Sequence, residues 1–125
     1  MQFQNKNIIV LPHQQFYKAE DLSDSLILNQ KFLYNQFDNC NLTNVTFENC
    51  VLAYCSILNS FAKNLQFKDC DLTGTRVYNT SQYNLTFDNC DLSGFHAENS
   101  EDKSIFLNCF KFNSGYKLPN ERINF

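Results

Sequence analysis

Cysteine residues recur in this chain at a spacing that raises the question of chemistry. The segments FENCVL, FKDCDL and FDNCDL place Cys50, Cys70 and Cys90 twenty residues apart, and FDNCNL places Cys40 ten residues earlier. Such a series could bind zinc, form disulfides or supply a nucleophile. A zinc site usually includes a close C-x-x-C pair, which this sequence lacks. A nucleophile needs exposure and a neighbouring base.

The rest of the chain offers no catalytic constellation. His13 and His96 are isolated, and neither a G-x-S-x-G elbow nor a glycine-rich phosphate loop is present. We therefore predict that the protein is not an enzyme and uses no cofactor and no metal.

A five-residue period explains the cysteine spacing. Of the sixteen positions reached in steps of five from Leu22 to Ala97, thirteen are large and apolar, two are alanine and one is Gln82. Helices and strands have periods of 3.6 and 2, so neither produces this pattern. A chain that turns a corner every five residues closes a four-sided coil in twenty residues. Stacked coils then satisfy one another's backbone groups as in a parallel sheet.

A second register lies two residues before the first and contains the cysteines. From Cys40 to Phe95 every member is small or apolar. Cys50, Cys70 and Cys90 would then stack roughly 4.8 Å apart on successive coils, pointing in parallel into the interior. That distance permits a disulfide, but the parallel direction and the burial typical of cysteine favour core packing. We predict that the cysteines are packing residues.

The chain resembles the pentapeptide-repeat proteins, whose loose consensus is A-(D/N)-L-x-x. The resemblance rests on Cys40-Asn41-Leu42, Cys70-Asp71-Leu72 and Cys90-Asp91-Leu92 together with the five-step register, and covers about two-thirds of the chain. It implies an all-β fold, a right-handed quadrilateral β-helix of about four coils with short terminal caps. Gln30, Asn35 and Gln82 depart from the pattern at nominally inward positions, which predicts an imperfect first coil and one polar side near the end.

The boundaries expected from this pattern are an N-terminal cap at 1–20, the repeat β-helix at 21–104, and a C-terminal cap and tail at 105–125. The five-step register begins to fail after residue 105. In the family that the chain resembles, a terminal element often mediates dimerisation. The resemblance therefore implies a homodimer through a terminal cap, beside the alternative of a monomeric cap with a loose tail.

Composition narrows the classes of function. The chain has 125 residues, a net charge of −3, and only 3 glycines and 2 prolines, so asparagine is expected to form the turns. The acidic balance argues against direct nucleic-acid binding, and no apolar run is long enough to span a membrane. The N-terminal segment lacks the apolar core and cleavage site of a secretory signal, so a cytoplasmic location is expected.

Outward positions of the repeat sort into two pairs of sides. One pair is acidic but interrupted by Lys68, and carries Glu48, Asp69, Asp71, Asp88 and Asp91. The other pair is aromatic, has His96 nearby, and carries Tyr34, Tyr54, Leu58, Phe61, Arg76, Tyr78 and Tyr83. Exposed aromatic residues beside an arginine are typical of protein-binding hot spots, although the same residues could simply cover neighbouring coils.

Two functions follow as hypotheses. The first is a non-catalytic module that binds another protein through Tyr54, Leu58, Phe61, Arg76, Tyr78 and Tyr83, for example a bacterial immunity or antitoxin-like neutraliser. The second follows from the resemblance, since some pentapeptide-repeat proteins bind DNA gyrase in place of DNA and protect it from quinolones. Mimicry of DNA would need roughly a dozen acidic groups along a rod of this length. The acidic sides offer only the five named above.

Overall fold

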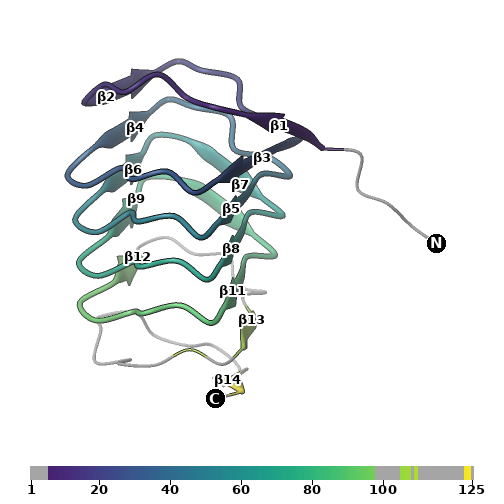
Figure 1. The fold of residues 1–125 in the computed structure, drawn as a ribbon, viewed down its shortest axis with the longest axis vertical. Coiled ribbons are helices and arrows are strands. Elements are labelled where there is room, and N and C mark those ends of the chain that lie inside the picture. The colour runs from purple at the N-terminus through teal and green to yellow at the C-terminus, as the bar shows by residue number, and fades with distance from the viewer. Residues whose placement is uncertain (1–5, 98–104, 108, 110–122, 125) are drawn as a thin grey trace.

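The computed structural model describes residues 6–97, 105–107, 109 and 123–124, with the side chains of 6–97 and 109. The described residues form short parallel strands and no helix, and therefore no helix that could cross a membrane. The chain winds as a four-sided β-solenoid of about five turns (Figure 1). The predicted all-β, stacked-coil fold is thus confirmed.

Two opposite sides of the solenoid are continuous parallel sheets, called face A and face B below. Face A contains β1 (Asn7–Ile9), β3 (Ser25–Leu28), β5 (Thr46–Glu48), β8 (Gln66–Lys68), β11 (Thr86–Asp88), β13 (Ile105–Leu107) and β14 (Ile123–Asn124), in that order. Face B contains β2 (Phe16–Lys18), β4 (Gln36–Asp38), β6 (Ser56–Leu58), β9 (Arg76–Tyr78) and β12 (His96–Ala97). On face B each residue pairs with the one twenty positions later, as Phe37 does with Ile57.

The other two sides pair less extensively. Face C contains β7 (Phe61–Lys63) and β10 (Ser81–Tyr83), extended toward the N-terminus by the bridges Asp21–Asn41 and Asn41–Phe61. Face D is held by single bridges that run through Lys31, Val51, Asp71 and Asp91. Along the chain the order of the sides is C, A, D, B, so that A and D share one corner and D and B share the next.

The corners explain why so few glycines are needed. Every fifth residue from Ala19 to Gly94 has a positive φ, between 50° and 66°. Asparagine tolerates this left-handed region better than most residues, and nine of the sixteen corner positions are asparagine. Asparagine side chains also bridge turns, as where Asn49 Nδ2 donates to Asn29 Oδ1 at 2.7 Å. The prediction that asparagine forms the turns is confirmed.

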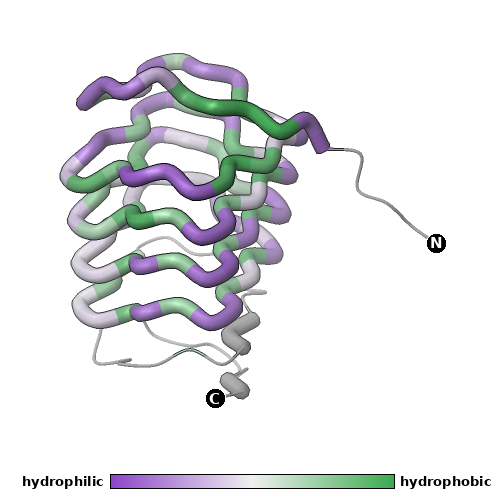
Figure 2. The backbone as a smooth tube through the Cα atoms, in the orientation of Figure 1, coloured by the Kyte–Doolittle hydropathy of each residue, from purple (hydrophilic) through white to green (hydrophobic). Residues whose placement is uncertain are grey.

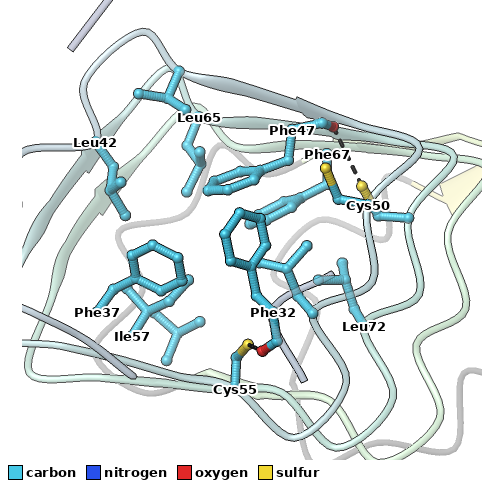
Figure 3. Packing of buried hydrophobic residues seen from close by; sticks show 14 of the residues in the cluster. Phe32, Phe37, Leu42, Phe47, Cys50, Cys55, Ile57, Leu65, Phe67 and Leu72 are labelled. Atoms are coloured by element: carbon cyan, nitrogen blue, oxygen red, sulfur yellow. Dashed lines mark hydrogen bonds between the residues drawn. The ribbon is translucent and has the colours of Figure 1, made fainter. Parts of the chain in front are cut away.

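The core lies inside the four sides and is built from the two predicted registers. All positions of the first register from Leu22 to Leu92 are buried, and Ala97 is half-buried. On face A the rings of Phe47, Phe67 and Phe87 stack at centroid distances of 5.5 and 5.4 Å. Figure 3 shows rings from three sides meeting in the interior, where Phe32 and Phe37 contact edge to face at 5.5 Å. Hydropathy along the chain follows the same period (Figure 2).

The first turn is built from residues expected in the N-terminal cap. β1 and β2 pair in parallel with β3 and β4, which adds one turn to the predicted four. On face D this turn makes no backbone bridge to the next turn, unlike the later turns that the structure describes. Instead, the amide of Gln30 accepts from Leu11 N at 2.9 Å and donates to Leu11 O at 3.2 Å. The side-chain amide therefore takes the place of a neighbouring backbone in the turn that precedes the predicted first coil.

The other two departures from the pattern, Asn35 and Gln82, are buried. Asn35 is buried and its side chain donates to the carbonyl of Gln14, again in the first turn. Gln82 is fully buried in the inward column of face C, beyond Ala62. At the other end Phe87 pairs with Phe106, nineteen residues later, so the twenty-residue register fails near residue 105 as predicted. The rest of the expected C-terminal cap lies outside the described residues, except β14 and Cys109.

Candidate partner-binding surface

The cysteines lie in the interior as core residues. All six are free and buried. In the inward column of face D, Cys50, Cys70 and Cys90 each donate to the carbonyl of an apolar residue in the preceding turn, at 3.3 to 3.4 Å. Within the described part of the chain no group of three or more potential ligands is arranged to hold a metal ion. Their burial confirms the prediction that these cysteines pack in the core.

The thiols of Cys55 and Cys70 are held in the protonated state, whereas the hydrogen bond with Cys70 lowers the pKa of Cys50. Cys55 donates to the carbonyl of Phe32, the contact drawn at the bottom of Figure 3, and burial raises the pKa of its thiol to about 12. The hydrogen bond with Cys50 raises the pKa of Cys70 to about 12 as well. A buried thiol that stays protonated at neutral pH is a poor nucleophile and a poor metal ligand.

The predicted acidic residues lie on two adjacent sides. Glu48 and Asp88 are on face A, and Lys68 lies between them in the strand register. Asp69 is at the corner between faces A and D, where it accepts from Asn89 Nδ2 at 2.8 Å.

The remaining two acidic residues, Asp71 and Asp91 on face D, are tied to the local backbone. Each uses its Oδ1 atom to accept from the residue two positions later. Asp71 binds the backbone N of Thr73 at 3.0 Å and its hydroxyl at 2.6 Å. Asp91 binds Ser93 N at 3.0 Å and Ser93 Oγ at 2.8 Å. These carboxylates have a structural role in shaping the turn.

Most of the predicted aromatic residues gather on face B and its two corners. Leu58 and Tyr78 are register neighbours on β6 and β9, and both are half-buried. Arg76 is exposed and lies beside Ser56 and His96 in the same ladder.

Two aromatic residues lie on face C. Phe61, exposed to 58%, follows the corner from face B, so it continues the surface of Leu58 and Tyr78. Tyr83 is at the other end of β10, paired with Lys63, while Ser81 is the residue that pairs with Phe61. The strand register therefore separates Tyr83 from the other predicted residues.

The sequence pattern predicts Tyr34 and Tyr54 as outward aromatic residues, but it does not identify the corner between faces D and B that they share with two glycines. The successive residues of this corner are Tyr34, Tyr54, Gly74 and Gly94, all with positive φ. The rings of Tyr34 and Tyr54 stack at 5.3 Å, and the ring of Tyr54 continues over Gly74. The other three corners consist of asparagine, aspartate and one alanine. The signal was present in the sequence, in the column read every twenty residues from position 34.

This corner opens onto a hollow on face B. One part lies among Tyr54, Ser56, Gly74, Arg76 and Gly94, and has a volume of about 300 Å³. The adjoining part, of about 490 Å³, lies among Arg76, Tyr78, Gly94 and His96. The two parts share Arg76 and Gly94, so that a ring, a guanidinium and a glycine backbone border one continuous surface.

Solved structures with a similar fold are pentapeptide-repeat proteins, while no protein-family model and no curated protein sequence matches the chain. A trypsin-treated variant of QnrB1, a plasmid-mediated fluoroquinolone resistance protein, superposes with a TM-score of 0.58 at 17% identity, covering 84% of this chain and 54% of the other. The chain thus spans about half the length of that protein. The pentapeptide repeat protein Rfr23 from the cyanobacterium Cyanothece 51142 aligns over 95% of this chain and 88% of its own, with 7% identity and a TM-score of 0.31. At 17% identity the likeness to QnrB1 concerns the fold.

Proposed function

We propose that the protein is a non-catalytic binding module of the pentapeptide-repeat type, which holds a partner protein on face B, its corners and the adjoining end of face C at Phe61. The observation that carries the proposal is the group of Tyr54, Arg76 and Phe61, each exposed on a rigid, hydrogen-bonded framework. Tyrosine and arginine are enriched among the few residues that supply most of the binding energy in protein interfaces. A framework that does not reorganise on binding also lowers the entropic cost of association.

The partner that fits this proposal is a cytoplasmic protein that the module neutralises, in the manner of a bacterial immunity protein or antitoxin. A small, mildly acidic chain with no catalytic group would act by occupying a surface. Its net charge of −3 disfavours direct binding to nucleic acids, so the proposed partner is a protein.

The experiment is capture of a partner from the native cell lysate with wild-type and substituted protein, followed by affinity measurement with the captured protein. Tyr78→Ala and Phe61→Ala should each weaken binding about tenfold or more while the melting temperature changes little. Lys63→Gln, on face C, is the matched surface control. Normal binding by both alanine variants, or loss of folding in both, would refute this interface.

A second candidate is suggested by the fold shared with QnrB1: binding to DNA gyrase through an acidic surface that imitates DNA. The acidic surface has fewer free carboxylates than the sequence count, because Asp71 and Asp91 each commit one oxygen to a turn and Asp69 joins a corner ladder. Lys68 also interrupts the column of Glu48 and Asp88. These contacts make mimicry the weaker proposal.

Mimicry is tested in a gyrase supercoiling assay at increasing salt. Inhibition or protection that fades with salt, and disappears when Glu48 and Asp88 are both changed to lysine, would establish it. These two positions are preferred over Asp71 and Asp91, whose replacement would also remove a turn contact. If micromolar protein has no effect on gyrase supercoiling, DNA mimicry is excluded for this chain.

A further inference from the structure

The corner between faces D and B departs from the rule that the other corners follow. At those corners asparagine and aspartate side chains hydrogen-bond from turn to turn, as between Asn84 and Asn64 at 2.5 Å or Asn44 and Asp24 at 2.8 Å. Here the chain instead places two tyrosines in the left-handed region, at φ 62° and 60°, followed by two glycines. Tyrosine is disfavoured in that region, and such strain is often found at functional sites. The stability of the framework therefore does not explain why tyrosine replaces asparagine at this corner, and a functional role is the explanation we pursue.

The change from tyrosine to glycine is what creates the hollow. The Tyr54 ring covers Gly74 so closely that a Cβ there would lie 2.5 Å from two ring carbons. One turn later Gly94 is exposed, and a Cβ there would meet only the backbone of Gly74, at 3.6 Å. The space beside Gly94 is therefore open, with the Tyr54 ring as one wall and Tyr78 and His96 as the other.

Arg76 carries a positive charge into this hollow with no partner of its own in the described part of the chain. Its backbone N donates to Cys55 O, and its guanidinium makes no hydrogen bond or ion pair with a described residue. Its register neighbours are Ser56 and His96, so no carboxylate lies beside it in the ladder. The nearest acidic residue by strand position on face B, Asp38, lies two strands away at the other end of the register and accepts from Asn59.

We infer that this hollow binds the carboxylate of an aspartate or glutamate on an extended segment of the partner protein. This inference rests on the proposed function and names the chemistry that the surface recognises. The guanidinium of Arg76 would take the carboxylate, since arginine presents a planar pair of donors suited to it. The segment's backbone would pass over Gly94, where no Cβ obstructs it, and against the Tyr54 ring that covers Gly74.

The size and charge of the surroundings select a peptide over a nucleic acid. A single unpaired arginine matches a single carboxylate, whereas a polyanion would also meet the carboxylates of faces A and D. The aromatic wall formed by Tyr54 and Tyr78 suits the apolar parts of a peptide. A loop or tail with one acidic residue is therefore the occupant that the contacts fit.

The test uses random linear peptides displayed and selected on the intact wild-type protein. Selected peptides should be enriched in aspartate or glutamate, and their affinity should fall about tenfold or more for Arg76→Gln. Gly94→Asn should have a similar effect, because it fills the hollow with the residue that most other corners already use. Lys63→Gln removes an exposed cation from face C and should leave the affinity unchanged.

Several results would overturn the inference. Binders without acidic enrichment, binders insensitive to both Arg76→Gln and Gly94→Asn, or no binder at all would each do so. Failure of the proposed function is distinguishable from these results. It would appear as lysate capture that is insensitive to Tyr78→Ala and Phe61→Ala as well. If capture depends on those two residues but not on Arg76, the module stands and only the acidic recognition is wrong.

Discussion

The ring of Tyr54 occupies the space that a Cβ on Gly74 would need, one turn of the solenoid later. Two ring carbons lie 2.5 Å from that position, so the tyrosine and the glycine are matched across neighbouring turns. The same ring stacks on Tyr34 at an interplanar angle of 12°. The three residues form one column in which the last member must lack a side chain.

Replacing Gly74 with alanine tests this match. The left-handed φ of +64° alone costs an alanine about 1 kcal/mol. Displacing the Tyr54 ring would add about 1 kcal/mol through loss of its stacking on Tyr34. We expect Gly74→Ala to lower the free energy of unfolding by about 2 kcal/mol in urea denaturation, by the sum of these two terms.

Gly94→Ala is the matched control, because its φ of +66° is nearly the same but its Cβ would make ordinary contacts. Gly94→Ala should lower the free energy of unfolding by about 1 kcal/mol, the cost of placing alanine in the left-handed region alone. In a Tyr54→Ala background the cost of Gly74→Ala should fall to the same value. Equal costs for the two glycines in the wild-type background would contradict the match.

The amide of Gln30 closes the first turn by binding both backbone groups of Leu11, and its removal should loosen that turn selectively. Gln30→Ala leaves the Leu11 donor and acceptor without their partner, at a cost of about 1 kcal/mol. Hydrogen exchange should accelerate at the Leu11 amide, while the amide of Phe67 in the central turns keeps its protection. Gln15→Ala removes an exposed amide one turn earlier and should change neither site.

A buried thiol makes the stability of the protein depend on pH above the neutral range. The folded pKa of Cys55 is about 12, whereas an unfolded cysteine titrates near 9. Between these values the unfolded state has lost the proton that the folded state keeps. The free energy of unfolding therefore falls as pH rises from 9 toward 12, by up to about 1.4 kcal/mol per pH unit. Below pH 9 the contribution of this thiol is fully present.

Cys55→Ser isolates this effect, since serine does not ionise in the range. One turn later in the same column, Thr75 already donates a hydroxyl to Leu52 O at 2.7 Å, so an oxygen donor fits the site. Between pH 8 and 10 the wild-type protein should lose about 1.4 kcal/mol more in urea denaturation than the serine variant. Identical pH slopes would mean that Cys55 ionises equally in both states.

In the folded protein at neutral pH, a thiol-reactive dye should label none of Cys50, Cys70 and Cys90 rapidly.

The core could be predicted from the sequence, because burial in this fold repeats with a single period. Stepping by five from Leu22 found the inward column, and the second register found Cys55 and Thr75, because every inward side chain meets the same environment. The function of Gln30 could not be found this way. Its position in the register predicted an irregular turn, but its two bonds depend on where Leu11 lies, and residues before the register have no period.

The candidate site was predicted in part for a similar reason. The period assigned Arg76, Tyr78 and Leu58 to one outward surface, as the register of β6 and β9 has it. The period did not separate Tyr83 from Phe61, because both are outward positions of face C. In the structure they lie at opposite ends of the short strands of that face. The hollow arises because Gly94 has no side chain, while the Tyr54 ring covers Gly74 one turn earlier. A pattern of apolar positions carries no information about such a gap.

Tyr54→Asn is the substitution that best separates folding from recognition. Asparagine is the common corner residue, so it should relieve about 1 kcal/mol of left-handed strain at φ 60°. It would also lose the stacking on Tyr34, worth about 1 kcal/mol, so that stability should change little. The affinity for an acidic peptide should nevertheless fall about tenfold, because the ring is one wall of the hollow.

Tyr34→Asn provides the control, since it removes the same stacked pair and relieves a similar strain one turn earlier. Tyr34 does not border the hollow beside Arg76, so its replacement should leave peptide affinity within about twofold, well short of the loss expected for an anchor residue. Calorimetry of both variants and titration with one selected peptide would give the comparison. Equal loss of affinity in the two variants would show that the stacked pair as a whole, and not the wall at Tyr54, makes the contact. A large fall in melting temperature for Tyr54→Asn alone would instead show that its ring is needed for the framework.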